Sequence, residues 1–225
     1  MSTLIEIKDL YYIYPADNNV IFEGASAEFN SGEKVAIIGQ LGSGKTTLLK
    51  LILGLERPTR GSILILGNDI GSFRRSRLDK MRRNMGVVFE DISLISNLKV
   101  IENVALPLQY HTRLAEKSIM ERAVFLLKFV GYKGDIWALP GTLPFYTKKI
   151  VAIARAMALE PAIMIYDRLL EGLDSLQSVQ VLRFVDEFHK QKTQRLSIMV
   201  ANDEKDVKDF APARILRIDN RRLIK

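Results

Sequence analysis

The alternation of apolar and polar positions predicts a series of strands in the first third of the chain. Residues 5–14 and 20–29 alternate loosely and predict two strands joined by a turn at 15–19. The short apolar, partly β-branched run at 34–38 predicts a buried strand. The run at 62–66 predicts another strand after a turn rich in Pro and Gly.

The middle and last thirds have different patterns. Residues 97–139 predict mostly helix, and a stripe of apolar positions at helical spacing is typical of a core-facing surface: Ile119, Ala123, Leu126, Leu127 and Val130. The last third predicts strands at 163–166, 196–200 and 214–218 and a helix at 175–190. Alternation of strands and helices favours an α/β fold with a mostly parallel sheet and helices on both faces.

The composition limits the class of protein. With 225 residues, 48% of them hydrophobic, the chain is long enough for one domain with a sizeable core. It has no apolar run of about 18 residues or more, as a membrane-spanning helix requires, and its first residues lack the pattern of a signal peptide. The absence of cysteine excludes disulfides and thiolate metal sites. A cytoplasmic location is the resulting expectation.

The formal net charge of +7 indicates an acidic partner, which could be a nucleotide, an anionic lipid or a nucleic acid. Much of the positive charge lies in residues 73–83. Such a run is most often the solvated face of a helix, and contact with lipid headgroups or a membrane subunit is the alternative. No nucleic-acid-binding module is visible in the sequence, so nucleic acid is not an expected partner.

The strongest chemical signal is the phosphate loop, residues 39–46, which has the spacing G-x-x-x-x-G-K-[ST]. Glycines allow close approaches that a Cβ would block, so successive N–H groups can converge on phosphate oxygens. Its residues are Gly39, Gln40, Leu41, Gly42, Ser43, Gly44, Lys45 and Thr46. The strand at 34–38 and an apolar helix predicted at 47–53 give this loop its required setting. A Gly-rich turn without a ligand is the alternative.

Within this loop, two side chains are expected to act on a nucleoside triphosphate. Lys45 would lie between the β- and γ-phosphates, and the Thr46 hydroxyl would bind Mg²⁺. Thr47 is a further nucleotide-binding candidate.

With these landmarks in order, the chain resembles the nucleotide-binding domain of an ABC transporter over essentially its whole length. The matching segments are Tyr14, the phosphate loop, 86–91 at the Q-loop position, 151–156 after the signature position, 162–167 at the Walker B strand and 172–174 at the D-loop. The resemblance implies a P-loop NTPase fold of the ABC type, with an antiparallel β subdomain beside the parallel core. It implies one domain over 1–225, with a helical subdomain inserted at about 92–160.

The resemblance also implies cofactors and partners. The cofactors would be ATP and Mg²⁺, and the partners a second cassette, identical or different, and an integral-membrane permease at the inner face of the cell membrane. Residues 100–108 look most like small bacterial cell-envelope cassettes. The phospholipid-trafficking Mla type is nearest, with the LolD and FtsE types close behind.

Two residues outside the phosphate loop carry over as binding candidates. Tyr14 would stack on adenine, since an aromatic face binds a base, and Asp167, at the end of an apolar strand, would hold Mg²⁺ directly or through water. The alternatives are an ordinary strand tyrosine and a plain strand-end aspartate.

Four positions depart from the family pattern. Arg168 stands where the family has the glutamate that polarises the attacking water, and a guanidinium has no acceptor with which to act as a base. Asn202 stands in place of the histidine that contacts the γ-phosphate. The chain's histidines, His111 and His189, are expected to be ordinary surface residues.

The other two departures affect the signature and the Q-loop. The family signature Leu-Ser-Gly-Gly-Gln is replaced by the signature segment, Leu143-Pro144-Phe145-Tyr146-Thr147. Proline removes an N–H donor and the aromatic residues fill space that glycines leave open, so this surface is not expected to clamp nucleotide. Glu90 replaces the Q-loop glutamine; it could still approach Mg²⁺, but it adds negative charge near the phosphates.

Together these departures predict a cassette subunit that binds Mg-ATP and hydrolyses it slowly or not at all. A single general base is worth about 10²–10⁴ in rate. Three alternatives stay open: drift in a dispensable copy, an active transport ATPase that tolerates the substitutions, and a soluble regulatory scaffold with the ABC fold.

Overall fold

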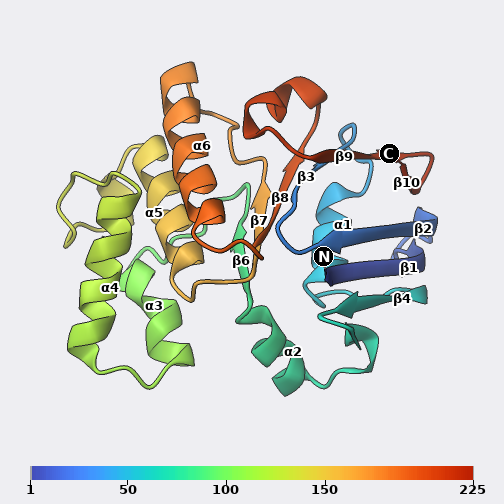
Figure 1. Ribbon diagram of the computed structural model, residues 1–225, viewed down its shortest axis with the longest axis horizontal. Helices are drawn as coiled ribbons and strands as arrows, with labels where there is room; N and C mark the ends of the chain where they lie inside the picture. Colours follow the sequence, from blue (N-terminus) through green and yellow to red (C-terminus); the bar gives the residue numbers. More distant parts are fainter. Residues whose placement is uncertain (1, 225) are drawn as a thin grey trace.

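The computed structural model describes residues 2–224 and contains two sheets with the helix α1 (Lys45–Ile52) packed between them (Figure 1). The smaller sheet is antiparallel, with the strand order β2-β1-β4-β5. Its strands are β1 (Thr3–Ile13), β2 (Val20–Asn30), β4 (Arg60–Ile65) and β5 (Asn68–Asp69). The N-terminal third of the chain therefore forms mainly this antiparallel layer.

The larger sheet is mostly parallel and has the order β10-β9-β3-β8-β7-β6. Its strands are β3 (Lys34–Ile38), β6 (Met85–Val88), β7 (Ile163–Asp167), β8 (Leu196–Ala201), β9 (Arg214–Asp219) and β10 (Arg222–Ile224). Only the pair β9–β10 is antiparallel among the described strands of this sheet. The carboxyl ends of β3, β8, β7 and β6 therefore meet at one edge.

The remaining helices lie mainly on the face of the parallel sheet that is turned away from the antiparallel sheet (Figure 1). They are α3 (Val100–His111), α4 (Glu116–Phe129), α5 (Phe145–Met157) and α6 (Ser175–Lys190). α2 (Arg75–Arg82) precedes β6, and short 3₁₀ turns occur at η1 (Ile70–Ser72), η2 (Pro140–Thr142), η3 (Glu204–Asp206) and η4 (Lys208–Phe210).

The parallel sheet is buried on both faces, which explains its continuous apolar strands. Along β3, Ala36 and Ile38 pack with the α3–α6 helices, whereas Val35 and Ile37 pack with α1 and the antiparallel sheet. Successive side chains of a strand point to opposite faces, so each parallel strand contributes to two hydrophobic cores. Because each strand is packed from both faces, the positions of the strand ends are fixed. The loops that follow these ends are fixed with them.

The α/β architecture and the mostly parallel sheet are confirmed, and the predicted strands and the helix at 175–190 lie within about two residues of the observed ones. Between β6 and β7 the chain forms α3, α4, η2 and α5; the subdomain boundaries at 92–160 remain a prediction. The 3₁₀ turns and the strands β5, β6 and β10 were not predicted. Within residues 2–224, no helix combines the length and apolar character that a membrane crossing needs.

Candidate nucleotide-binding site

The carboxyl edge of the parallel sheet brings together the segments that the sequence marked separately. Ile38 pairs with Ala201, and Asp167 pairs with Val200. The phosphate loop therefore follows β3, Asn202 follows the neighbouring strand β8, and Arg168 follows β7. Glu90 comes two residues after β6, the next strand. In open α/β sheets this edge is where ligands bind.

The backbone of the phosphate loop adopts conformations that require glycine. Gly42 and Gly44 have φ angles of 80° and 100°, which L side chains rarely adopt. A Cβ on Gly44 would also lie 2.5 Å from Ile21 Cγ2. α1 begins directly after this residue, so the N–H groups of its first turn face the loop without an acidic residue beside them. A helix N-terminus of this kind favours a phosphate.

Lys45 lies under the loop rather than in solvent. Its side chain is buried, and its Nζ donates to the carbonyl oxygens of Gly39 at 2.6 Å and Gln40 at 2.8 Å. Burial lowers the pKa of Lys45, and the positive charge of Arg168 lowers it further, while Asp167 and Glu90 act in the opposite direction. An anion bound in the loop would stabilise the Lys45 ammonium and so offset both the cost of its burial and its repulsion by Arg168.

Tyr14 and Thr47 contact each other at the edge of this site. The Tyr14 hydroxyl and the Thr47 Oγ1 are 2.7 Å apart, and the Tyr14 ring is half-buried against the ring of Tyr12. Thr47 is buried, whereas Thr46 and Leu41 are exposed. Tyr14 therefore lies against α1, beside the phosphate loop, and its stacking on a base stays a prediction.

Asp167 is a buried carboxylate at the end of β7, and its role as a ligand of Mg²⁺ stays a prediction. It is 3% exposed, and its pKa is raised to about 6, first by burial and then by the charge of Glu90; Arg168 and Lys45 oppose that rise. A divalent cation would favour the ionised form that burial penalises. Residues 2–224 contain no group of three or more acidic or histidine side chains suited to a metal ion. A donor set of the Thr46 hydroxyl and the Asp167 carboxylate fits Mg²⁺, which commonly uses one or two carboxylates together with phosphates and water.

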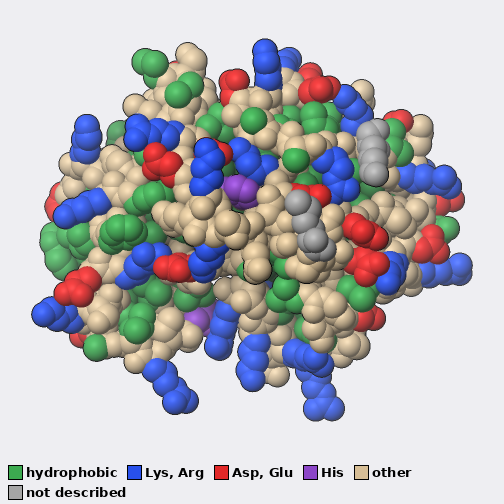
Figure 2. All heavy atoms as spheres, in the orientation of Figure 1, with side chains coloured by type: hydrophobic (Ala, Val, Ile, Leu, Met, Phe, Trp, Pro, Cys, Tyr) green, Lys and Arg blue, Asp and Glu red, His purple; other side chains and the backbone are tan. Residues whose placement is uncertain are grey.

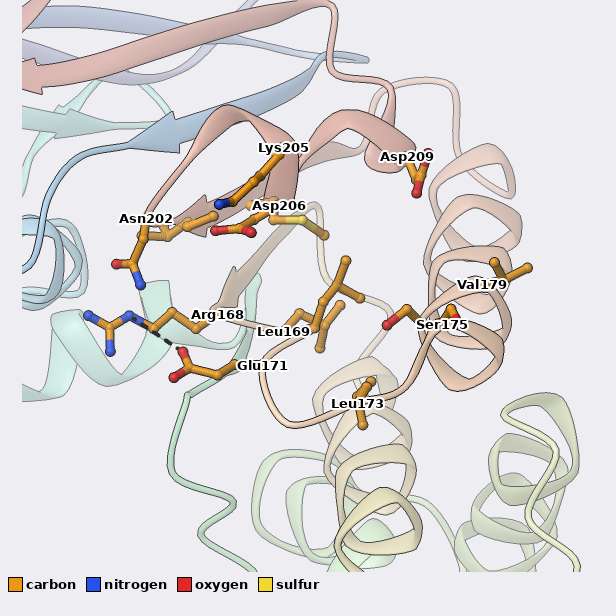
Figure 3. A pocket seen from close by; sticks show the side chains of 15 residues that line it. Arg168, Leu169, Glu171, Leu173, Ser175, Val179, Asn202, Lys205, Asp206 and Asp209 are labelled. Atoms are coloured by element: carbon orange, nitrogen blue, oxygen red, sulfur yellow. Dashed lines mark ion pairs between the residues drawn. The ribbon is translucent and has the colours of Figure 1, made fainter.

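Arg168 and Glu90, the two charged departures, form an ion pair. Arg168 Nη1 donates to Glu90 Oε1 at 2.7 Å, and Arg168 Nε lies 3.9 Å from Glu171 Oε2. The Arg168 backbone adopts a φ of 45° and donates its N–H to Val200. Figure 3 shows the guanidinium and the Asn202 carboxamide extending toward the same side of a cleft of about 550 Å³. A second cleft, of about 680 Å³, runs along residues 39–43.

The signature segment packs against its own D-loop. A Cβ on Gly172 would lie 2.8 Å from the Phe145 ring, so the half-exposed ring covers this glycine. Lys149, one turn further along α5, is 1% exposed; its Nζ donates to the Glu171 carbonyl at 2.7 Å and lies 5.0 Å from the Phe145 ring centroid. Lys149 was not predicted as a site residue. The available signal was its position directly before the apolar run 150–154.

One buried amide holds the segment between Glu90 and α3. Asn103 is fully buried, accepts from the Ile95 N–H at 2.8 Å, and donates to the carbonyls of Ile95, Leu98 and Lys99. The backbone after Glu90 is therefore fastened to the first turn of α3. No local sequence pattern signals this role.

One expectation about histidine is wrong. His189 is half-buried on α6, and its Nδ1 lies 2.9 Å from the Oγ of the fully buried Ser197 on β8. Burial lowers the pKa of His189, and the charges of Lys34 and Arg195 add to that effect. His111 is exposed at the end of α3, as expected. Neither histidine belongs to the sheet edge that carries the phosphate loop.

A glycine loop at the carboxyl end of a central parallel strand, leading into a helix with a buried lysine, defines a P-loop nucleotide-binding domain. Residues 22–170 match the family model described as ABC transporter. The chain belongs to the ABC transporter family as an ATP-binding subunit, and the resemblance found from its motifs is confirmed.

Two curated relatives show the range of transport within this family. The chain is 32% identical over 220 residues to the methionine import ATP-binding protein MetN of Clostridium tetani, covering 98% of the chain and 68% of the relative. It is 32% identical over 210 residues to the intermembrane phospholipid transport system ATP-binding protein MlaF of Haemophilus influenzae, covering 93% and 78%.

Solved structures agree on the fold. The dimeric post-hydrolysis state of the ATP-binding cassette MJ0796, bound to ADP and Pi, superposes with a TM-score of 0.89 at 26% identity, covering 99% of this chain and 97% of the other. CbiO1 from Clostridium perfringens, part of the ABC transporter complex CbiONQ, gives 0.88 at 26% identity, covering 100% and 88%.

Proposed function

We propose that this ATP-binding subunit holds Mg-ATP in the phosphate loop but hydrolyses it very slowly, within an envelope transporter for phospholipid. In that proposal ATP acts as a structural ligand or a slow switch. Tyr14 would stack on the base, the loop amides and Lys45 would hold the phosphates, and Thr46 and Asp167 would hold Mg²⁺, which screens phosphate charge.

The observation that carries the proposal is Arg168 at the end of β7, directly after Asp167. Its guanidinium has only donors, stays protonated, and is bonded to Glu90. This protonated guanidinium cannot accept a proton from an attacking water. Asn202, after β8, is neutral and offers no general base either.

The signature segment supports the same conclusion from the other half of a composite site. Pro144 precedes α5 without an N–H, and Phe145 occupies the space over Gly172. In a pair of identical subunits both nucleotides would face this surface. In a pair with a different cassette, the partner could supply an intact signature to this phosphate loop, while its own loop would face Phe145.

The transporter context rests on likeness to relatives. The name of the MlaF relative gives intermembrane phospholipid transport, CbiO1 is described as part of a transporter complex, and MJ0796 as a dimer. By analogy, this chain would pair with a second cassette and dock on an integral-membrane permease at the inner face of the membrane. The exposed arginines of α2, in a region where basic side chains project from the surface (Figure 2), would suit anionic headgroups or acidic permease loops there.

Calorimetry and turnover on the complex isolated from its native membrane test the proposal. Mg-ATP should bind, and Lys45→Ala should abolish binding, whereas Lys50→Ala, on the same helix, should not. Starting from a typical kcat of about 10 s⁻¹, loss of a general base predicts roughly 0.001–0.1 s⁻¹. No affinity for Mg-ATP in folded protein would refute the proposal.

A second candidate is an active import ATPase that tolerates these substitutions, favoured by the 32% identity to the methionine import protein. Turnover above about 1 s⁻¹ that disappears in Lys45→Ala would favour this candidate. The identity of the co-purified membrane subunit would separate phospholipid transport from amino acid import.

A further inference from the structure

The guanidinium of Arg168 is held in one orientation rather than left to sample solvent. Its side chain is 15% exposed, its backbone N–H is bonded to Val200 on the neighbouring strand, and Glu90 accepts from Nη1 at 2.7 Å. The ion pair joins positions 78 residues apart, at the ends of two adjacent strands. An arginine fixed in this way loses less entropy when it binds a further acceptor.

Half of the donor fork remains available. Nε lies 3.9 Å from Glu171 Oε2, beyond hydrogen-bond distance, and Nη2 has no hydrogen-bond partner among residues 2–224. The Nε–Nη2 edge can donate two parallel hydrogen bonds to one oxyanion group, which is the geometry of arginine–phosphate recognition. Glu90 uses Nη1 and need not be displaced.

The position of Arg168 at the end of β7 determines which phosphate it can bind. β7 is separated from β3, which carries the phosphate loop, by the single strand β8, or about 10 Å at ordinary strand spacing. Arg168 is close enough to Lys45 for its charge to lower the pKa of that lysine. The first turn of α1 holds the phosphates nearest the loop, and Lys45 is expected between the β- and γ-phosphates, so the terminal phosphate is the one that extends toward the end of β7.

We propose that Arg168 binds the terminal phosphate of a nucleoside triphosphate and makes the site selective for triphosphate over diphosphate. This inference rests on the proposed function, because it requires nucleotide in the phosphate loop. In the place of a base that would consume the triphosphate, the chain has a cation that retains it. Arg168 is thus a specificity-determining residue, and Asn202 lies on the same side of the cleft as a neutral neighbour.

The test compares Mg-AMP-PNP, a triphosphate analogue that resists hydrolysis, with Mg-ADP in calorimetric titrations of the full chain. Arg168→Gln should weaken Mg-AMP-PNP binding by about 10–100-fold, the range for one charge-assisted interaction, and should change Mg-ADP binding by less than about twofold. Arg168→Lys keeps the charge without the fork and should give an intermediate loss. Arg183→Gln, which removes an exposed arginine of α6, is the control for net charge.

The outcomes separate the two proposals. If neither nucleotide binds the wild type, the proposed function itself fails. If both nucleotides bind the wild type, the decisive quantity is the ratio of their affinities. An Arg168→Gln variant in which this ratio is unchanged, or shifts further toward triphosphate, refutes the role of Arg168 while nucleotide binding stands. Thermal melting of Arg168→Gln, Arg168→Lys and Arg183→Gln checks that the comparison is made on folded protein.

Discussion

Replacing Asn103 by leucine tests whether one buried amide fastens the segment that follows Glu90. Leucine has the same branched skeleton as asparagine, so the change removes hydrogen bonds without opening a cavity, although its two methyl groups are bulkier than the amide atoms and add some overpacking. The Asn103 amide has two hydrogens for three neighbouring carbonyls, those of Ile95, Leu98 and Lys99, so those bonds are partly shared. Its oxygen accepts from the Ile95 N–H.

The expected cost is set by the groups that lose every partner. The carbonyl of Lys99 also accepts from the Asn103 backbone, and that of Ile95 accepts from the Leu98 backbone. The Ile95 N–H and the Leu98 carbonyl have no other partner among residues 2–224. At about 1–3 kcal/mol for each unsatisfied group, the expected destabilisation is about 2–6 kcal/mol, with the lower end applying if water reaches the Ile95 N–H.

Urea unfolding measures this loss, and Asn97→Leu is the matched control because Asn97 is exposed in the same segment. Hydrogen exchange should also accelerate at residues 92–99 in Asn103→Leu, since local opening no longer breaks these bonds. A difference in unfolding free energy below about 0.5 kcal/mol between the two variants would contradict the reasoning.

Three further predictions concern other parts of the site and the core. Lys149→Met should accelerate amide exchange within residues 171–174 by about tenfold, through loss of the bond to the Glu171 carbonyl, whereas Lys148→Met should not; equal protection in both would count against that anchor. Gly44→Ala should destabilise the protein by about 1–3 kcal/mol in denaturant unfolding, because the φ of 100° and the 2.5 Å approach to Ile21 Cγ2 both oppose a Cβ; Gly141→Ala, with nothing within 4 Å, should cost much less. The pKa of His189 is lowered in the folded state, so the unfolded chain binds the proton more readily and stability should fall as pH drops below about 6.5. His189→Asn should lose less stability than wild type between pH 7.5 and 5.5, and identical pH profiles would refute this; the raised pKa of Asp167 acts in the opposite direction in both proteins.

Local signals were enough to predict most of the fold and the phosphate loop. In the strand at 34–38, residues 35–38 are buried on both faces of the sheet and form an uninterrupted apolar run. The helix at 175–190 begins where Asp174 accepts from the Gln177 N–H, a capping arrangement visible in the sequence. α1 begins at Lys45 rather than 47, because the left-handed Gly44 starts the helix before its apolar stretch.

The remaining features depend on contacts between distant segments. The pairing of Arg168 with Glu90 follows from the register of β6 against β7, which no local pattern contains. His189 is followed in sequence by a run of polar residues and looks like a surface residue, yet its side chain lies against Ser197 of β8. Lys149 is of a residue type that is normally solvated, but here it is buried beside Phe145 and the Glu171 backbone.

The contact of Phe145 with Gly172 sets a condition on engineering a glycine signature into this chain. A glycine at position 145 would uncover Gly172 and remove the ring that lies over the Lys149 ammonium. A glycine signature grafted at residues 143–147 would therefore face a D-loop glycine and a buried lysine that pack against an aromatic ring. Such a graft would need compensating substitutions at these neighbours as well as in the signature segment.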